Sequence, residues 1–335
     1  MKAFYIERYG NKDVLRTGDR PMPELGDHDV LVDVHAAGVN QLDAKIRDGT
    51  FKLILRYPLP LILGNDVAGV VVRVGSRVTR VKPGDEIFAR PHQDRIGTFA
   101  EFFAMRESDV ALKPKSLTMA EAASIPLVGL TAWQALVEKA NLKSGQKVFI
   151  QAGSGGVGTF AIQLAKHLGA TVATTTSGAN TDLVKRLGAD VVIDYRQDDF
   201  AQILHDYDVV LHSQDKTALE KSLSVLKPGG HLISISGPLD VAFAQEQGAN
   251  WMLRLLTRAM SFSIRQKAKR RGVTYSFLFM RAQGDQLRQI ANLIDQSVIY
   301  PVVERLYSFA DTAEALAAVE QGRAKGKIVV QVKQD

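Results

Sequence analysis

The spacing of apolar positions changes about a third of the way along the chain. Up to about residue 122, short apolar runs alternate with Gly- and Pro-rich turns, as at 30–34, 67–74 and 99–104. Runs of this kind predict a compact, partly open β-barrel. Thr118 and Glu121 then have the spacing of a capping box, which predicts the start of a helix.

Beyond this point, candidate strands and helices alternate. A helical stretch is expected at 129–136. The candidate strands that follow lie at 147–151, 171–175, 191–193, 208–211, 231–235 and 275–280. The sequence Lys-Pro-Gly-Gly at 227–230 predicts a turn before the fifth strand. This alternation predicts a doubly wound parallel sheet and therefore an α/β protein.

A glycine-rich turn stands between the first of these strands and the next helix. Residues 152–158 read Ala-Gly-Ser-Gly-Gly-Val-Gly and follow the apolar run at 147–151. Glycines spaced in this way allow a tight turn, a close approach to pyrophosphate and close packing of the helix on the sheet. The helix that follows presents unpaired N–H groups to the phosphates. The turn therefore predicts a dinucleotide site formed by Gly153, Ser154, Gly155, Gly156, Val157 and Gly158.

The second candidate strand ends without an acidic residue. A cofactor that lacks a 2′-phosphate is normally held there by Asp or Glu, which accepts from the ribose 2′-hydroxyl. This chain instead has Thr176 and Ser177 at that end, and its next carboxylate is Asp182. Hydroxyl donors tolerate a phosphate that a carboxylate would repel. We therefore expect NADPH in preference to NADH.

The composition is that of an ordinary globular protein of about two domains. The 335 residues are 46% hydrophobic and 23% charged, and the net charge is +6. The basic residues are mostly scattered and accompany no nucleic-acid-binding motif, so we expect no nucleic-acid partner. The first residues carry charges early and lack a long apolar core, which argues against a signal peptide or an integral membrane segment. The chain has no Cys, which fits a reducing interior, and we expect a cytoplasmic protein.

One segment combines large apolar and basic residues. The stretch 251–271 contains Trp251, Phe262 and several Leu and Met residues together with seven Lys or Arg residues. An interfacial membrane helix or a partner-binding helix has this composition. A surface helix with one packed stripe and a solvated basic end is the plainer interpretation.

Several short motifs occur in a characteristic order along nearly the whole chain. Besides the glycine turn, they lie at 37–43, 63–71, 74–75, 81–85, 125–133, 187–190 and 322–327. Together they resemble the medium-chain dehydrogenase/reductase superfamily, specifically its zinc-independent quinone oxidoreductase (zeta-crystallin-like) and alkenal/enone reductase branch. The resemblance implies a GroES-like barrel domain at 1–122 and 283–335, completed by the C-terminal tail, around an inserted Rossmann domain at 123–282. It also implies a homodimer, for which the apolar run at 275–280 is the expected edge strand.

The same resemblance argues against a metal. Zinc-dependent relatives have a Cys where this chain has Asn40, and Gly-His-Glu where it has Gly-Asn-Asp at 64–66. Zinc needs three or four Cys, His or carboxylate ligands, and the seven His residues show no ligand spacing. We therefore expect no bound metal.

Without a metal, hydride transfer is expected onto an already electrophilic carbon, in a quinone or at the β-carbon of an enone or alkenal. Negative charge then develops on the carbonyl oxygen, which needs hydrogen-bond donors. The resemblance points to Asn40, Lys45 and Tyr57 as the catalytic residues. Lys45 would donate to the carbonyl or protonate the enolate, and a solvated lysine is the alternative for it. Asp43 is expected to cap or orient rather than to act as the acid.

The resemblance further implies cofactor contacts outside the glycine turn. These are Thr131 against the nicotinamide, Gly237, and, for the 2′-phosphate, Ser177, Tyr195 and Arg323. One departure concerns Asn180, which replaces the usual Lys of the turn after the second strand. Arg196 or Lys325 are the candidates to compensate for it.

Two other functions stay open. An enoyl-thioester reductase performs the same hydride step on a longer acyl substrate. A non-catalytic NADPH-binding sensor or partner protein would use 251–271 as its surface. The presence of Asn40, Lys45 and Tyr57 together favours an enzyme over the non-catalytic protein, and the enoyl-thioester reductase stays open as the alternative within the enzyme class.

Overall fold

The computed structural model describes residues 1–52, 55–246, 248 and 250–333. The chain divides into two compact units, one formed by Met1–Leu130 with Arg281–Asp335 and the other by Thr131–Met280. It passes from the first unit to the second within α3 (Pro126–Trp133), which continues as a π-helical turn, Gln134–Lys139. The domain limits expected at 122 and 283 stay a prediction.

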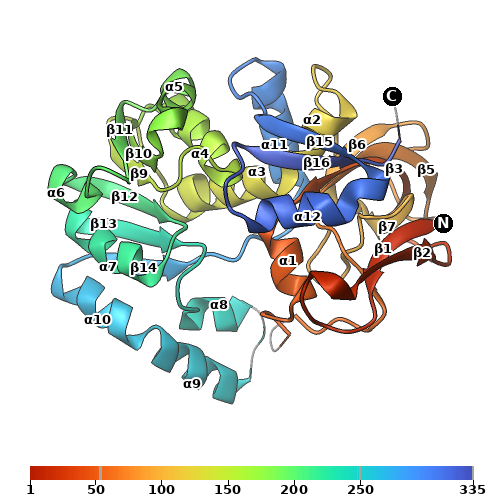
Figure 1. Cartoon of the computed structure of the whole chain (residues 1–335), viewed down its shortest axis with the longest axis horizontal. Helices are drawn as coiled ribbons and strands as arrows, with labels where there is room; N and C mark the ends of the chain where they lie inside the picture. The colour runs from red at the N-terminus through yellow and green to blue at the C-terminus, as the bar shows by residue number, and fades with distance from the viewer. Residues whose placement is uncertain (53–54, 247, 249, 334–335) are drawn as a thin grey trace. The chain divides into compact units, whose positions relative to one another are not determined.

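A mixed sheet forms the centre of the first unit (Figure 1). Its order is β15 (Val303–Ser308), β16 (Lys327–Gln331), β3 (Asp29–Val39), β5 (Val67–Val74), β6 (Glu86–Ala89) and β8 (Val110–Leu112), and β7 (Phe102–Arg106) also pairs with β3. Alternate residues of β3, namely Val30, Val32 and Val34, pack in one apolar cluster, as the two-residue period of a strand requires. The pairing of β16 with β3 is antiparallel, so the C-terminal segment completes the GroES-like sheet.

A smaller sheet and several helices complete the first unit. The small sheet contains β2 (Leu15–Asp19), β1 (Lys2–Ile6) and β4 (Leu61–Ile62). The helices are α1 (Gln41–Arg47), α2 (Met119–Ala123), α11 (Gly284–Asp295) and α12 (Thr312–Glu320), with short 3₁₀ turns at Lys12–Val14, Glu107–Asp109 and Phe309–Asp311. The predicted capping box begins α2, because Thr118 accepts from the Glu121 amide and its own amide donates to the Glu121 carboxylate.

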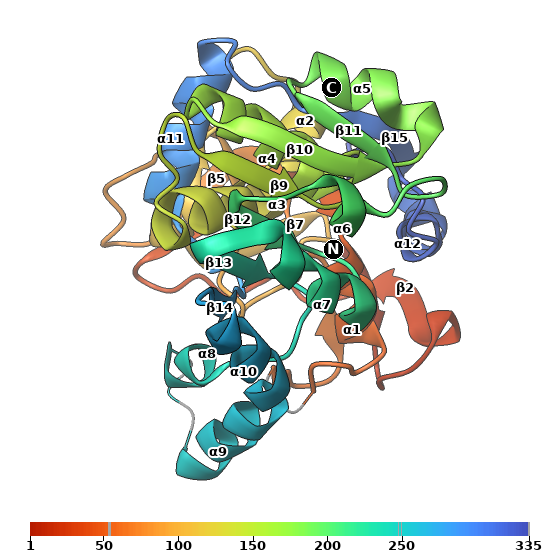
Figure 2. The same cartoon turned by 90° about the vertical axis from the view of Figure 1, so that its left-hand side faces the viewer.

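The second unit is a doubly wound α/β domain, as predicted. Its six described strands are all parallel and lie in the order β11 (Val191–Asp194), β10 (Thr171–Thr176), β9 (Lys147–Ile150), β12 (Tyr207–His212), β13 (Leu226–Ser234) and β14 (Thr274–Phe277), which Figure 2 shows along the sheet. This order places the first strand at the centre, where the direction of winding reverses, as in a Rossmann fold.

Two details of these strands differ from the sequence prediction. Residues 227–230 lie within β13 instead of forming a turn before it, because a register shift between Tyr207 and Val209 of β12 accommodates them as an irregularity in the strand. The last strand ends at Phe277, so 278–280 lie outside it although they are apolar.

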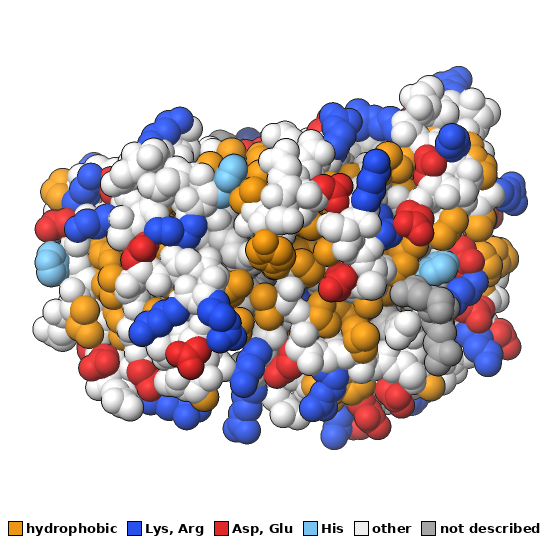
Figure 3. Space-filling model, turned by 90° about the horizontal axis from the view of Figure 1, so that it is seen from above, with side chains coloured by type: hydrophobic (Ala, Val, Ile, Leu, Met, Phe, Trp, Pro, Cys, Tyr) orange, Lys and Arg blue, Asp and Glu red, His pale blue; other side chains and the backbone are white. Residues whose placement is uncertain are grey.

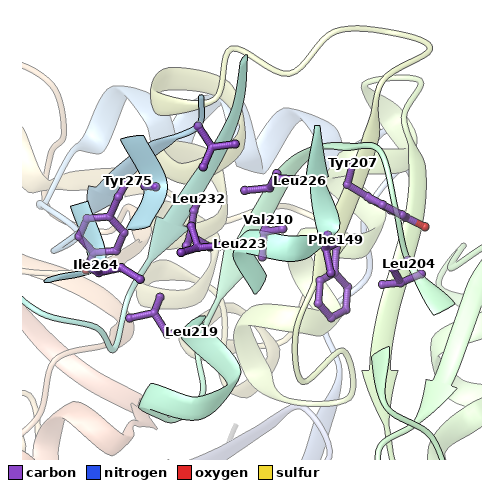
Figure 4. Close-up of a cluster of buried hydrophobic side chains, with 14 of the residues drawn as sticks. Phe149, Leu204, Tyr207, Val210, Leu219, Leu223, Leu226, Leu232, Ile264 and Tyr275 are labelled. Carbon is purple, nitrogen blue, oxygen red and sulfur yellow. The ribbon is translucent and has the colours of Figure 1, made fainter. Parts of the chain in front are cut away.

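Helices surround this sheet, and one apolar cluster forms on it. The helices are α4 (Gly156–His167), α5 (Thr181–Arg186), α6 (Phe200–Ile203), α7 (Lys216–Val225), α8 (Val241–Glu246), α9 (Trp251–Met260) and α10 (Phe262–Arg270), with a 3₁₀ turn at Gly178–Asn180. Figure 4 shows the cluster, which contains Phe149 of β9, Leu219 of α7 and Ile264 of α10. The apolar positions of strand and helix patterns therefore share one core.

Candidate functional site

A cluster of buried polar side chains surrounds the start of α1 in the first unit. Asn40 caps this helix, and its backbone amide donates to the Asp43 carboxylate at 2.7 Å. Asp43 is fully buried and accepts a second hydrogen bond from Asn65 Nδ2, also at 2.7 Å. Asp43 therefore caps and orients the helix, as expected.

The Asn40 side chain faces a buried ion pair. Its Nδ2 donates to Asp66 Oδ2 at 2.9 Å, and the Lys327 ammonium contacts both Asn40 Oδ1 and Asp66 Oδ2, the latter at 3.1 Å. Asp66 is 0% exposed and Lys327 5%. The other Asp66 oxygen accepts from the Leu127 amide at 2.7 Å. Both charges are thus paired, which a buried ion pair requires.

Burial shifts the ionisation of groups in this cluster. The pKa of Asp43 is raised to about 7 by burial, against the opposing effect of the hydrogen bonds from Asn65 and Asn40. Arg90 is 1% exposed, and burial lowers the pKa of its guanidinium. Arg90 donates to the Pro91 carbonyl at 2.7 Å and to Asn65 Oδ1 at 3.4 Å. Asn65 therefore links Arg90 to Asp43.

Lys45 and Tyr57 have different surroundings. Lys45 is exposed on α1, four residues after Gln41, which donates to the Val319 carbonyl. Tyr57 is partly buried and donates its hydroxyl hydrogen to the Gln93 carbonyl at 2.6 Å, and burial raises its pKa. The three expected catalytic residues thus share one unit, but Asn40 lies in the buried cluster, Tyr57 binds the backbone and Lys45 faces outward. Their catalytic roles stay a prediction.

The buried cluster occupies the positions where the family resemblance places zinc ligands. Asn40 and Asp66 contact the Lys327 ammonium there, and Asn65 binds Asp43. Within the residues that the structure describes, no group of three or more His, Asp or Glu side chains could hold a metal ion. The sequence reasoning missed Lys327, although it stands in the motif at 322–327, because its partners lie more than 250 residues away.

In the second unit, the glycine turn joins β9 to α4. A Cβ on Gly153 would lie 2.1 Å from Thr174 Oγ1, and one on Gly158 would lie 2.3 Å from the Ala152 carbonyl oxygen. At Gly155, the N-cap of α4, the nearest described atom would be that same carbonyl oxygen at 3.4 Å. Packing therefore requires glycine at 153 and 158. At 155 the space next to the backbone is free, so a ligand can approach the main chain there. The amides of the first turn of α4, which include those of Gly156 and Val157, lack partners within the helix and suit an anionic phosphate.

Neutral donors gather beside this turn at the end of β10. Thr176 donates to Ser154 Oγ at 2.9 Å, and Asn180 Nδ2 lies 3.3 Å from both Ser154 Oγ and Ser177 Oγ. Asn180 Oδ1 is buried and has no hydrogen-bond partner among the described residues. An amide can turn either its N–H₂ or its oxygen outward while the hydroxyls reorient. The cluster can therefore present donors to a phosphate or an acceptor to a hydroxyl.

A carboxylate that the linear sequence did not associate with this site lies close by. Thr176 of β10 pairs with Asp194 of β11, and the Asp194 carboxylate accepts from the amides of Gly178 and Arg196, each at 3.0 Å. Tyr195 follows it and is 59% exposed, with the Arg196 guanidinium 5.8 Å from its ring centroid. The residues at the end of β10 include no acid, but the Asp194 carboxylate of the neighbouring strand lies beside them.

Further polar groups meet at the carboxyl ends of β12 and β13. His212 is fully buried, and burial lowers its pKa to about 4, so the ring is neutral near pH 7. Its Nδ1 lies 2.8 Å from Ser234 Oγ, which also accepts from the Gly237 amide at 2.7 Å. Thr131 is 4% exposed. Ligands of doubly wound sheets bind at this end of the strands.

Arg323, the last expected phosphate ligand, is exposed and belongs to the first unit, between α12 and β16. Ser177 and Tyr195 belong to the second unit. The contact of Arg323 with a cofactor stays a prediction.

Comparison with known proteins gives matches along most of the chain. The family described as alcohol dehydrogenase GroES-like domain matches residues 26–115, and the family described as zinc-binding dehydrogenase matches residues 187–330. The mitochondrial NAD(P)H oxidoreductase of Danio rerio is 37% identical over 100% of this chain and 92% of its own length. The chloroplastic NADPH-dependent alkenal/one oxidoreductase of Arabidopsis thaliana is 35% identical over 98% of this chain and 79% of its own.

A solved structure extends the match to the fold. The quinone oxidoreductase from Coxiella burnetii is 30% identical, has a TM-score of 0.87 and is matched over 99% of both chains. The two sequence relatives are named for mitochondria and chloroplasts, so they do not support the cytoplasmic location, which stays a prediction.

Proposed function

Because this chain belongs to the medium-chain dehydrogenase/reductase superfamily, in its quinone-oxidoreductase-like branch, we propose that it is an NADPH-dependent, zinc-independent reductase of quinones or of the activated C=C bond of enones and alkenals. The relatives' names support an oxidoreductase that uses NAD(P)H. The observation that carries the cofactor assignment is the glycine turn, whose open backbone at Gly155 precedes the N-terminus of α4.

NADPH is the proposed form of the cofactor. The side chains beside the turn, Ser154, Thr176, Ser177 and Asn180, are uncharged hydrogen-bonding groups. Each oxygen of the nearby Asp194 carboxylate already accepts from a backbone amide, and the positive ends of these amide dipoles partly offset the negative charge that a 2′-phosphate would meet. Arg323 would add a charge-assisted hydrogen bond to the 2′-phosphate.

The proposed reaction uses the hydride that NADPH supplies when it is bound. The residues of this chain bind and orient the acceptor. Lys45 donates to the acceptor's carbonyl oxygen, where negative charge develops as hydride reaches the β-carbon, and the resulting enolate takes a proton from solvent water at its α-carbon. The buried cluster of Asn40, Asp43 and Asp66 with Lys327 fixes the start of α1, and thereby the helix that carries Lys45.

The deciding experiment measures NADPH and NADH oxidation with quinones, short enones, alkenals and enoyl-thioesters, and identifies each product by mass. We expect turnover with a quinone or an enone, faster with NADPH, and unchanged after exhaustive chelation of metals. Preference for a long enoyl-thioester would favour the acyl reductase instead. Binding of NADPH without turnover of any acceptor would favour the non-catalytic alternative, and loss of activity on chelation with recovery on adding zinc would contradict the metal-free mechanism.

We also propose a homodimer that pairs through β14. This strand is the last of its sheet, and an apolar edge is an aggregation risk unless it is paired. Sedimentation at micromolar concentration should give twice the chain mass. A stable monomer under these conditions would contradict this pairing.

A further inference from the structure

Helices α9 and α10 bury a narrow stripe of mostly small side chains. Thr257, Ser261, Ile264 and Ala268 are each at most 5% exposed, and their spacings of four, three and four residues place them on one helical face. Ile264 and Ala268 pack in the apolar cluster of the second unit. In Figures 1 and 2, α10 lies next to β14 and α9 extends from α10 away from the sheet. The largest side chains of the segment therefore do not contribute to its packed face.

The largest apolar residues of the segment face outward. Trp251 is 73% exposed, and both Leu255 and Phe262 are 59% exposed. The exposed apolar set is Trp251, Met252, Leu255, Leu256, Met260 and Phe262. On α9 the exposed apolar positions 251, 252, 255, 256 and 260 have the spacing of one helical face. A helix whose apolar face points away from the core exposes a contiguous patch, which marks an interaction site.

The same segment is strongly basic. Residues 251–271 contain seven Lys or Arg residues and neither Asp nor Glu. Lys267 pairs with Glu220 of α7 at 2.8 Å. Elsewhere, as Figure 3 shows for one face of the molecule, basic and acidic side chains are interspersed. The charge of this segment is therefore local and of one sign.

We propose that the α9–α10 surface docks on an anionic lipid bilayer. A helix with Trp, Phe and Leu on one side and Lys and Arg beside them lies in the interface, where apolar burial and attraction to anionic headgroups act together. No helix in the described part of the chain is long and apolar enough to cross a membrane, so the contact is peripheral. The docking does not depend on the proposed reaction.

Charge decides between a bilayer and the other occupants. Two copies that met through this surface would bring two sets of cations together without a carboxylate from 251–271 to pair with them. A nucleic acid would satisfy the cations but would leave the apolar face in water. An anionic bilayer satisfies both, because its headgroups are negative and its acyl boundary accepts apolar side chains.

Vesicle co-sedimentation of the full chain tests this inference. We expect binding to vesicles of phosphatidylcholine with 30% phosphatidylglycerol, and at least tenfold weaker binding to phosphatidylcholine alone. The apolar triple variant Trp251→Gln, Leu255→Gln, Phe262→Gln should lose at least tenfold in partitioning. The charge triple variant Arg258→Gln, Arg265→Gln, Lys269→Gln should lose at least as much, and its effect should shrink at high salt.

Matched control variants change exposed residues elsewhere. The apolar control is Met22→Gln, Ile203→Gln, Leu306→Gln, and the charge control is Lys12→Gln, Arg73→Gln, Lys115→Gln. Both controls should bind anionic vesicles within twofold of the parent. Thermal unfolding identifies any variant that fails to fold.

Tryptophan emission gives a test that needs no folded triple variant. Trp251 emission should shift to shorter wavelength with anionic vesicles and be quenched by brominated lipid, and Trp251→Phe, which retains Trp133, should abolish the shift. Absence of vesicle binding by the parent, equal binding to neutral vesicles, or equal loss in the controls would overturn the proposal. Conversion of a dimer to a monomer by the apolar variant would also overturn it. So would binding of duplex DNA by both the parent and the apolar variant, if neither binds vesicles.

Discussion

The candidate sites of the two units hold polar groups of different kinds. At the start of α1 in the first unit, the buried Lys327 ammonium is paired with the Asp66 carboxylate. Beside the glycine turn and at the ends of β12 and β13 in the second unit, the groups are neutral, as with Ser154, Asn180 and His212. The Lys327–Asp66 pair is therefore satisfied within the chain, whereas the second unit holds neutral hydrogen-bonding groups suited to a charged ligand.

This difference has a physical basis. Removing one partner of a buried ion pair destabilises the fold, because the other charge is left buried and unpaired. The pair therefore holds in place the backbone elements that carry its two residues. Neutral hydroxyl and amide groups carry no net charge that needs a partner, and they can reorient their hydrogen bonds around a phosphate. We expect substitutions in the first unit to change stability and substitutions in the second to change binding.

The largest expected effect is on the buried ion pair. Lys327→Met leaves the Asp66 carboxylate buried and unpaired, so the free energy of unfolding should fall by about 3–5 kcal/mol. Denaturant unfolding measures this change. Lys325→Met, at an exposed position two residues earlier, is the control and should change it by about 0.5 kcal/mol or less. Near-equal stability of the two variants would mean that the pair does not organise the first unit.

Lys45 differs from the buried charges of the first unit because its ammonium group is exposed on α1. Lys45→Met keeps most of the aliphatic stem and should leave unfolding nearly unchanged. Loss of a donor to the developing oxyanion should lower kcat with an enone by about 100-fold to 1,000-fold. Lys52→Met is the exposed control. If kcat of Lys45→Met stays within about twofold of the parent while NADPH affinity is unchanged, Lys45 is a solvated surface residue.

Substitution of Arg323 tests whether a charged residue of the first unit contributes to the binding of NADPH by the second. A charge-assisted hydrogen bond contributes about 1.5–3 kcal/mol, so Arg323→Ala should weaken NADPH binding about 10-fold to 150-fold. NADH binding should change little, because NADH lacks the 2′-phosphate. Isothermal titration with both cofactors measures this, with Arg73→Ala as the exposed control. Tighter binding of NADH than of NADPH by the parent would refute the cofactor preference.

Alanine substitutions at two glycines of the same turn should distinguish effects on stability from effects on cofactor binding. The Cβ of Gly158→Ala meets the Ala152 carbonyl at 2.3 Å, so this variant should lose about 1–3 kcal/mol of stability. Gly155→Ala has 3.4 Å to the same atom, so its stability should hold while cofactor affinity falls. Thermal unfolding without cofactor and fluorescence titration with NADPH check the pair. Equal affinity of Gly155→Ala and the parent would place the phosphates elsewhere.

The smallest effect is a pH dependence of opposite sign in the two units. The pKa of Asp43 is raised to about 7, so between about pH 4 and 7 unfolding releases a proton and stability falls as pH rises. The pKa of His212 is lowered to about 4, so between about pH 4 and 6.5 unfolding takes up a proton and stability falls as pH drops. Each slope is about 1.4 kcal/mol per pH unit, and the two nearly cancel where they overlap.

Single substitutions should separate these slopes. Asp43→Asn should leave stability rising with pH between about 4 and 6.5, and His212→Gln should leave it falling with pH up to about 7. Denaturant unfolding across this range measures both, and each slope should follow the transition of its own unit if the units unfold separately. Parallel pH profiles of the two variants would contradict the assignment of either pKa.

Features that depend on neighbours along the chain could be predicted from the amino-acid sequence. The alternation of strands and helices, the capping box at Thr118 and the packing roles of Gly153 and Gly158 are relations over a few residues. Backbone geometry fixes such relations locally, so a periodic pattern or a glycine spacing is enough to predict them. Even here 227–230 were misassigned, because a strand irregularity and a turn use the same residues.

Contacts between distant residues, and the direction in which a helix presents its apolar face, became known from the three-dimensional structure. The ion pair joins Asp66 to Lys327 across 261 residues, and strand register brings Asp194 beside Gly178. The plainer interpretation of 251–271 was a helix with one packed apolar stripe, but the structure buries Thr257 and Ile264 and leaves Trp251 and the other large apolar residues exposed. Periodicity gives the spacing of a face but neither its partner nor its direction, because those depend on how all the elements pack around one core.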